Sequence, residues 1–375
     1  MIQILPVQSK KDFKKFLHFP WQIYKNDPVW VPPLLVEEKK KFFQKTNPFF
    51  EHGQAQLFLA TKNARIVGRI SAHIDLLHNK THNEKTGFFG FFECINDVVV
   101  SRALLDTAAQ WLKNKGMDKI RGPFNFSIND ETGFLVKGFE YGPFILTPHN
   151  PAYYPELVVE SGFSKIKDLF CWKYDSKRPV PEVSQQIADV VHAYPGLVVR
   201  HVDMKNMERD VRIIIDVFNS AWSKNWGFVP LTESEIKKAV QDFKMILEPS
   251  IALIAEVNGV PTAISLAIPN MNEAIKDLNG RLFPFGIFKL LYRLKMKKIY
   301  SSRLVLLGIK KEFRSDVLGA LSVLLYTEMH KSSQKLKHWG GELGWTLEDN
   351  EKINRGIAMM GGDCYKIYRV YEKKL

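Results

Sequence analysis

The sequence has 375 residues and a formal net charge of +13, with 45% hydrophobic and 25% charged residues. This length suits two domains with sizeable cores, and the proportions are ordinary for a globular protein. The apolar runs fall short of the roughly 18 residues that a membrane span needs, and the N-terminus lacks the residue order of a signal peptide. The positive charge favours a polyanionic partner: coenzyme phosphates, RNA, DNA or anionic lipid.

Cysteines and histidines give little support to a metal site. Three scattered cysteines lack CxxC spacing, which argues against a disulfide framework and a cysteine metal site: Cys94, Cys171 and Cys364. His78 and His82 are four residues apart and follow His73, but no set of acidic or cysteine ligands accompanies them. We therefore predict a solvated polar loop over 78–86, no metal site and a cytoplasmic location.

The first and second halves of the chain repeat each other. IQILPV from Ile2 matches LVVRHV from Leu197 at an offset of 195 residues. QLFLATKNARIVGRISAHID from Gln56 matches IALIAEVNGVPTAISLAIPN from Ile251 at the same offset. Each member of the second pair has two apolar runs around a short polar turn, which predicts an antiparallel hairpin in each half.

Beyond the hairpins the register of the repeat changes. The sequence from Asp97 matches that from Asp316 at an offset of 219, so the second copy contains an insertion of 24 residues, placed at about 271–302. Both copies otherwise have the same order: strand, one or two helices, hairpin, strand, helix, strand, helix, strand. This order predicts an α/β fold in which each copy is a mixed sheet with helices on both faces.

A linker is expected between the copies. The segment SKRPVPEVS, from Ser176 to Ser184, combines two prolines with charges. The two domains are then expected over 1–176 and 184–375.

Much of the insertion reads as a basic amphipathic helix within GRLFPFGIFKLLYRLKMKKI, residues 280–299. At helical spacing one side holds Phe288, Leu291, Leu294 and Lys298, and another holds Lys289, Arg293 and Lys297. Such a helix suits peripheral contact with an anionic membrane, or a lid over an acyl pocket. It equally suits a cover over the sheet edge or the seam between the domains.

The stretch from Arg303 to His330 predicts a buried strand, a charged turn and a helix. Leu304 to Ile309 is a nearly continuous apolar run, as expected for a strand covered on both faces. Charges at 310–312 interrupt it, Asp316 is a suitable helix N-cap, and apolar residues at helical spacing follow. A strand that feeds a helix N-terminus directs unpaired N–H groups and the positive dipole end into one space, which is a natural anion site.

This stretch resembles the central strand, phosphate loop and helix of the GCN5-related N-acetyltransferase (GNAT) superfamily. In that family the strand diverges from its neighbour to hold pantetheine, and the loop binds the coenzyme A pyrophosphate. The family's loop reads Arg or Gln, two residues, Gly, one residue, Gly or Ala; Arg314 and Gly319 match, and Val317 stands where the first Gly is expected. The resemblance implies a site for acetyl-CoA or a longer acyl-CoA, formed by Leu307, Gly308, Ile309, Arg314, Ser315, Val317, Leu318, Gly319 and Asn350.

Further segments resemble a bacterial family of two-domain GNAT-like proteins, the YghO-like family. In the first half these are GFFGFFE (87–93), RGPFNFSINDETGFLVKGFE (121–140) and HNPAYYPELVVESGFSKIKDL (149–169). In the second half they are NSAWSKNWGFVPLTESE (219–235), LEDNEKINR (347–355) and YRVYEK (368–373). In the first copy only Asn96 and Asp97 separate the strand from the helix, so this copy has no phosphate loop and is not expected to bind coenzyme A in the usual way.

Acylation of an amine needs a base, a donor to the developing oxyanion and an acid for the leaving thiolate. The resemblance assigns the donor to a backbone N–H within Leu306 to Ile309. We choose Glu342 as base or ammonium ligand; the other interpretation is an edge carboxylate paired with a lysine. The position of the family's acid, a tyrosine, falls at Ile357, so Tyr365 and Tyr368 are the candidate substitutes.

Two groups of side chains are candidates for binding the acceptor. In the second copy they lie in the loop that borders the acceptor pocket of this fold and beside Glu342: Trp222, Asn225, Trp226, Phe228 and Trp345. In the first copy they are polar and aromatic groups that suit the lining of a cleft: Glu93, Asn125 and Tyr153. The alternatives are a loop pinned at the domain interface for the first group and Asx turns for the second.

The resemblance implies transfer of an acyl group from acyl-coenzyme A to an amine of a small or lipid-like acceptor. Other two-copy members of the superfamily transfer aminoacyl or long-chain acyl groups, so both remain alternatives. A GNAT-like protein that binds a ligand without turnover is the non-enzymatic alternative. Nucleic acid is not an expected partner.

Overall fold

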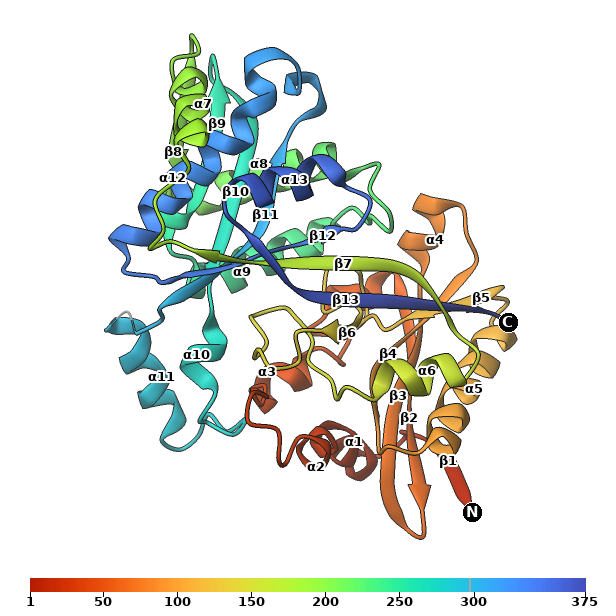
Figure 1. The fold of residues 1–375 in the computed structure, drawn as a ribbon. Helices are drawn as coiled ribbons and strands as arrows, with labels where there is room; N and C mark the ends of the chain where they lie inside the picture. Colours follow the sequence, from red (N-terminus) through yellow and green to blue (C-terminus); the bar gives the residue numbers. More distant parts are fainter. Residues whose placement is uncertain (297) are drawn as a thin grey trace. The chain divides into compact units, whose positions relative to one another are not determined.

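The computed structural model describes residues 1–296 and 298–375, and for Asp316 the backbone alone. The chain divides into two compact units (Figure 1). Unit 1 comprises Met1–Leu169, Ile275–Lys289 and Lys366–Leu375, and unit 2 comprises Phe170–Ala274 and Leu290–Tyr365. The residues of the expected linker, 176–184, therefore lie within unit 2.

Both halves of the sequence share the core order of strand, helices, hairpin, strand, helix, strand, helix and strand, to which each half adds further elements. The first half has β1 (Ile2–Pro6), α1 (Lys10–His18), α2 (Pro20–Ile23), α3 (Leu35–Lys40), η1 (Pro48–Glu51), β2 (Gly53–Lys62), β3 (Arg65–Asp75), α4 (Leu76–His82), β4 (Thr86–Cys94), α5 (Val98–Asn114), β5 (Lys119–Gly122), β6 (Phe134–Lys137), α6 (Tyr154–Glu160) and β7 (Ser164–Asp175). The second half has α7 (Glu182–His192), β8 (Leu197–His201), η2 (Met204–Asn206), α8 (Met207–Trp222), α9 (Glu233–Ile246), η3 (Pro249–Ile251), β9 (Ala252–Val257), β10 (Val260–Pro269), α10 (Met271–Ile275), α11 (Gly286–Lys295), β11 (Ser301–Ile309), η4 (Lys311–Phe313), η5 (Asp316–Ala320), α12 (Leu321–Lys335), β12 (Gly340–Leu347), α13 (Glu351–Met359) and β13 (Asp363–Lys374).

The predicted hairpins and the mixed sheets are confirmed. The pairs β2–β3 and β9–β10 are antiparallel, whereas β4–β5 and β11–β12 are parallel. In unit 1 neighbouring strands follow the order β1, β2, β3, β4, β5, β13. In unit 2 the order is β7, β12, β11, β10, β9, β8.

Each sheet has helices on both faces, because successive strand side chains point to opposite sides. In unit 1, Phe58 belongs to the core under α5 and α6, while Leu59 belongs to the core under α1 and η1. In unit 2, Leu253 packs with α7 and α12, while Ile254 packs with α8 and α9. Among the described residues no helix is long and apolar enough to cross a bilayer.

The last strand of each half is shared between the units. Figure 1 shows both as long strands, β7 in yellow-green and β13 in dark blue. The first part of β7 belongs to unit 1 and its residues from Phe170 belong to unit 2, beside β12. β13 starts in unit 2, but its residues from Lys366 belong to unit 1, where Tyr371 pairs with Gly122 of β5. Each unit therefore contains strand residues from the other half of the sequence.

Two local predictions were wrong. The stretch from Asp316 forms the 3-10 helix η5, and the α-helix begins only at Leu321, because a tight turn leads into it. The stretch over 78–86, predicted as a loop, begins with the helix α4. Asp75 caps this helix, since its carboxylate accepts hydrogen bonds from the backbone N–H groups of Leu77 and His78 at 3.0 Å.

Candidate active site

The strands β11 and β12 diverge at a bulge. They pair from their first residues up to Leu304 and Leu343, although both strands continue beyond these residues. At the same point β11 contains one extra residue, Val305, between the partners of Leu266 and Ala267. The bulge lies in the ladder with β10, and beyond Leu304 the edge of β11 that faces β12 lies outside the paired register of these two strands. This is the divergence that the GNAT resemblance implied.

The loop after β11 is held against the end of α8. Arg314 donates from Nε to the carbonyl of Ile309 at 2.8 Å and from Nη2 to the carbonyl of Ala221 at 2.9 Å. Lys311 donates from Nζ to Oγ of Ser223 at 2.6 Å. Two exposed cations therefore stand on this loop, and both also fix its position.

The rest of the predicted phosphate loop forms one tight turn. Ser315 and Val317 are exposed, while Leu318 is buried. A Cβ atom on Gly319 would lie 3.1 Å from the carbonyl oxygen of Arg314, so a side chain there would crowd the turn. The first N–H groups of a helix have no acceptor within it, and η5 presents such groups beside the two cations.

The predicted aromatic loop meets the predicted cofactor strand. The Trp222 ring lies so close to Gly308 that a Cβ atom there would be 2.3 Å from it. Phe218 bridges Trp222 and Phe228, with ring centroids 5.2 and 5.4 Å away. Asn225 donates its backbone N–H to the carbonyl of Trp222 at 2.7 Å, and Trp226 is the next residue of this turn. The structure thus brings Trp222, Asn225, Trp226 and Phe228 to the end of β11.

Glu342 and Tyr365 also lie together, but in a buried cluster. The Glu342 side chain is 0% exposed, and the Tyr365 hydroxyl donates to its Oε2 at 2.7 Å. Arg303, its partner across the ladder, lies 3.3 Å from Oε1. Arg303 is five residues before Gly308, so the cluster is roughly 15 Å from the aromatic loop along the strand. The carboxylate itself does not face solvent, whereas Tyr365 is partly exposed.

The remaining predicted residues of the second copy have separate positions. Tyr368 belongs to unit 1, is 1% exposed and pairs with Leu135 of β6. Asn350 caps α13, where its side chain accepts a hydrogen bond from the backbone of Ile353 at 3.5 Å. Trp345 is half-buried on β12, beyond the paired part of the strand.

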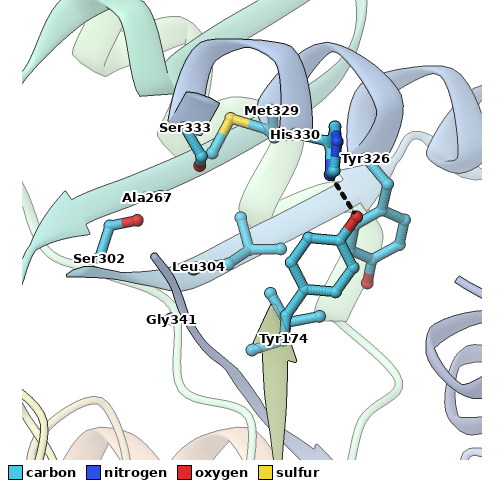
Figure 2. A pocket seen from close by; sticks show the side chains of 11 residues that line it. Tyr174, Ala267, Ser302, Leu304, Tyr326, Met329, His330, Ser333 and Gly341 are labelled. Carbon is cyan, nitrogen blue, oxygen red and sulfur yellow. Dashed lines mark hydrogen bonds between the residues drawn. The ribbon is translucent and has the colours of Figure 1, made fainter. Parts of the chain in front are cut away.

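A small cavity lies under α12, beside the paired part of β11 and β12. Its volume is about 30 Å³, enough for about one water molecule and too small for a substrate. Figure 2 shows Tyr174 and His330 facing each other in its wall, with Leu304 alongside; the Tyr174 hydroxyl lies 2.8 Å from Nδ1 of His330. Burial lowers the pKa of His330, which favours the neutral ring. The cavity is a packing feature and not the candidate site.

In unit 1 the corresponding divergence is occupied by the chain itself. β4 and β5 pair only up to Phe88 and Arg121. Next to this point the Asn125 side chain accepts a hydrogen bond from the backbone N–H of Phe91 at 2.7 Å. A Cβ atom on Gly90 would lie 1.8 Å from the carbonyl oxygen of Phe124, so the following chain rests directly on β4. The Asn125 side chain therefore already accepts the hydrogen bond of the Phe91 N–H, a backbone group to which a ligand would otherwise bind.

Glu93 lies in a second buried cluster. The hydroxyls of Tyr24 and Tyr154 donate to its Oε2 at 2.9 and 2.7 Å, and Arg69 lies 3.6 Å from its Oε1. Burial raises the pKa of Glu93 to about 7, although Arg69 opposes the shift. Tyr153 donates to the carbonyl of Cys94 at 2.8 Å rather than to Glu93.

An open groove of about 600 Å³ lies beside this cluster in unit 1. Its walls include the rings of Tyr24, Tyr153 and Phe139, with Asp27 and Glu140 among the polar groups. This volume is in the range of small-molecule sites. Two of the three predicted first-copy residues, Glu93 and Tyr153, thus lie at or directly behind one groove.

Sequence reasoning missed the partners of both buried carboxylates: Arg303, Tyr24, Arg69 and Tyr154. They reach the carboxylates from neighbouring strands or distant helices, so no local pattern marks them. For the histidines, the described residues contain no group of three or more His, Cys, Asp or Glu side chains that could hold a metal ion.

Comparison with known proteins places this geometry in a family. The bacterial ceramide synthase of Caulobacter vibrioides (strain NA1000 / CB15N) is 39% identical over 380 residues, which cover 100% of this chain and 98% of that protein. Protein YghO of Escherichia coli (strain K12) is 36% identical over 369 residues, 98% of this chain and 94% of its own length. The chain belongs to the YghO-like family. No protein-family model matches the sequence.

Solved structures show the fold of this YghO-like protein. A tandem GNAT protein from the clavulanic acid biosynthesis pathway superposes with a TM-score of 0.60 at 11% identity, covering 100% of this chain and 98% of that one. A GCN5-related N-acetyltransferase from Anabaena variabilis gives 0.50 at 7% identity, covering 100% and 72%. The YghO-like protein therefore has the tandem GNAT fold, as the resemblance implied.

Proposed function

We propose that this protein is an N-acyltransferase that moves an acyl group from acyl-coenzyme A to the amine of a lipid-like amino alcohol. The observation that carries the proposal is the divergence of β11 and β12 at the Val305 bulge in unit 2. Acyl transfer to an amine is the reaction that the name of one full-length relative, the bacterial ceramide synthase, supports, and the tandem GNAT fold agrees with it.

The residues around the divergence fit an acyl-coenzyme A. The end of β11, beyond its pairing with β12, consists of Leu307, Gly308 and Ile309. The loop that follows carries Lys311 and Arg314. Cations beside the N-terminus of η5 suit a pyrophosphate, which is dianionic. The bound thioester would supply the activated acyl group. In unit 1 Asn125 occupies the equivalent place, so we assign the site to unit 2 alone.

The nature of the acceptor rests on a relative. A ceramide is an amide between a fatty acid and a long-chain amino alcohol, and the Caulobacter relative is named a bacterial ceramide synthase. We extend this acceptor class, and an acyl chain longer than acetyl, to the present chain. A lipid-like amine and acyl-coenzyme A are its proposed partners, and the cytoplasm its proposed compartment.

The chain's own groups suggest how the reaction is assisted. In this proposal a backbone N–H of β11 beyond the bulge, within Leu306 to Ile309, donates to the acyl oxygen, where negative charge develops. The Tyr365 hydroxyl, held by the buried carboxylate of Glu342, is the partly exposed end of a proton path. The rings of Trp222 and Phe228 would cover the site at the end of β11, on the side away from Glu342 and Tyr365.

Two measurements test the proposal: formation of the amide product and binding of coenzyme A. The full-length protein is incubated with acetyl- or palmitoyl-coenzyme A and a long-chain amino alcohol, and the amide is measured by mass spectrometry. Calorimetry with coenzyme A compares the unmodified protein with Arg314→Glu. Lys113→Glu, an exposed residue of α5 in unit 1, is the charge-matched control.

We expect the long-chain amide, and coenzyme A binding weakened by about tenfold or more in Arg314→Glu only. Coenzyme A binding without any amide would overturn the acceptor class. Equal binding by Arg314→Glu and the unmodified protein would overturn the loop assignment.

A further inference from the structure

The segment from Arg281 to Tyr300, here called the basic–aromatic segment, exposes an unusual amount of apolar surface. Seven large apolar side chains in it have exposed fractions from 52% to 79%: Phe283, Phe285, Phe288, Leu291, Tyr292, Met296 and Tyr300. In the rest of the described chain, the most exposed Phe, Tyr or Trp ring is Phe43, at 42%. Clustered exposed aromatic residues mark an interaction surface, whereas scattered ones do not.

The helix α11 directs this surface outward. Phe288, Leu291, Tyr292 and Lys295 follow at helical spacing and are all exposed. On the other side Ile287, Leu290 and Leu294 are half-buried. Both sides of the helix thus carry apolar residues. The chain partly covers one side and leaves the other exposed to solvent.

Hydrogen bonds and an ion pair hold the helix in this orientation. Arg293 donates from Nη1 to the carbonyl of Ala274 at 2.6 Å, and Lys289 pairs with Asp277. Both contacts connect α11 to the region of α10, which precedes it in the chain. The exposed stripe therefore lies on a helix that is held to the segment before it.

The charge around the stripe is of one sign. Between Leu278 and Tyr300 the sequence has six Lys or Arg residues and no Asp or Glu. Arg281, Lys295 and Lys298 are exposed, and Nζ of Lys298 lies 4.8 Å from the Tyr292 ring. Cations that surround exposed aromatic and aliphatic residues match a surface with phosphate groups above an apolar layer.

We infer that the basic–aromatic segment docks this protein on the surface of an anionic lipid bilayer. Phe285, Phe288 and Leu291 enter the boundary between headgroups and acyl chains, while Lys295 and Lys298 contact lipid phosphates. Two copies of the chain are a poorer occupant, because a symmetric contact would bring two sets of cations together. The inference concerns binding alone and does not depend on the proposed reaction.

Vesicle flotation of the full-length protein tests the inference. Vesicles of phosphatidylcholine alone are compared with vesicles that also contain phosphatidylglycerol. The apolar test variant is Phe285→Ser, Phe288→Ser and Leu291→Ser combined, and the charge variant is Lys295→Glu with Lys298→Glu. The matched control, Val183→Ser, Val190→Ser and Met245→Ser, removes three apolar side chains that are 59%, 62% and 81% exposed elsewhere.

We expect the unmodified protein to bind anionic vesicles at least about tenfold more tightly than neutral ones. In both test variants the affinity for anionic vesicles should fall by about tenfold or more. The control variant should bind like the unmodified protein, and thermal unfolding should show that all variants fold. Absence of binding to anionic vesicles, or unchanged binding by the apolar variant, overturns the inference.

Light scattering without lipid measures the oligomeric state and so tests the alternative that a second copy of the chain binds the segment. A monomer is expected. A dimer that the apolar variant alone converts to monomer would show that the segment is an interface between copies, and would overturn the bilayer assignment.

Discussion

Tyr365 is the side chain that connects the buried carboxylate of Glu342 with the surface of unit 2. Its hydroxyl donates to Oε2 at 2.7 Å, while Arg303 faces the other carboxylate oxygen. The proposed proton path to Glu342 runs through this hydroxyl and leaves the carboxylate buried. The same hydrogen bond also holds the start of β13 in place. A test of the Tyr365 hydroxyl must therefore separate its proposed role in proton transfer from its role in the structure.

Tyr365→Phe removes the proton path and keeps the ring. We expect the turnover number for amide formation to fall by about ten- to a hundredfold and its dependence on pH to change, since general acid–base assistance is typically worth this much. The measurement is the pH profile of turnover. Tyr326→Phe, which removes a hydroxyl from α12 of the same unit, should keep the profile; an unchanged profile in Tyr365→Phe would exclude the proton role.

Glu93 predicts a pH dependence of stability. Burial raises the pKa of its folded form to about 7 from an ordinary value of 4.5. Between these two pH values the folded form holds a proton that the unfolded form has lost, so the free energy of unfolding decreases as pH rises. The loss is at most about 3 kcal/mol and is complete above pH 7.

Chemical unfolding at several pH values compares the unmodified protein with Glu93→Gln, which keeps an acceptor for Tyr24 and Tyr154. The variant should become relatively more stable from pH 4.5 to 7. Parallel curves would mean that Glu93 ionises equally in both states.

At the scale of elements, the contact between α8 and β11 depends on a missing side chain. Gly308→Ala would place a Cβ atom 2.3 Å from the Trp222 ring, so the ring or the strand must move. We expect a loss of about 1–3 kcal/mol in the free energy of unfolding, as in other overpacked sites, and weaker coenzyme A binding.

The matched control is Gly356→Ala in α13, where nothing lies within 4 Å of the added atom. It should be neutral or stabilising by up to about 1 kcal/mol, because alanine favours a helix interior. Equal destabilisation by both substitutions, measured by chemical unfolding, would contradict the packing argument.

The elements that sequence predicted well are those with a local signal. Both hairpins follow from two apolar runs around a short polar turn, and the strand, loop and helix after Arg303 follow from the change in periodicity. The cap of α4 by Asp75 was also local, but the polar composition of 78–86 concealed it. The 3-10 turn at η5 depends on how the loop is held to α8, which periodicity cannot show.

The site was predicted in parts for the same reason. The sequence suggested Glu342 as a base and Tyr365 as an acid, but it gave no sign that the two side chains are in contact. Their neighbour Arg303 was not predicted at all. Asn125 was assigned to the substrate, whereas the structure places it against the backbone of Phe91. Contacts across strands or between distant segments have no spacing rule, so only the fold reveals them.

At the scale of the whole molecule, each compact unit contains residues from both halves of the sequence. Unit 1 includes Lys366–Leu375, and Lys366 is fully buried there, with Nζ donating to the carbonyl of Gly142 at 2.7 Å. Arg369 makes two hydrogen bonds to Asp168, at 2.7 and 2.9 Å. The end of the chain is therefore part of the core structure of unit 1.

A chain that ends at Tyr365 should lose structure in unit 1, far away in sequence. Hydrogen exchange measured by mass spectrometry should show faster exchange in β5 and β6, whose partner strand is absent. Adding a synthetic peptide with the sequence of Lys366–Leu375 should restore protection in part. Unchanged exchange in β5 would mean that β13 only covers unit 1 and does not stabilise it.

This shared strand has a consequence for synthesis on the ribosome. The first half of the chain leaves the ribosome early, but β5 has no β13 beside it until β13 has emerged. At ~5–20 residues per second, making the chain between β7 and β13 takes roughly 10 to 40 seconds. During that time β5 is an open sheet edge, and such edges attract other nascent chains. Slow translation of the second half would lengthen this interval, so the yield of folded protein should depend on chaperones that shield the waiting edge.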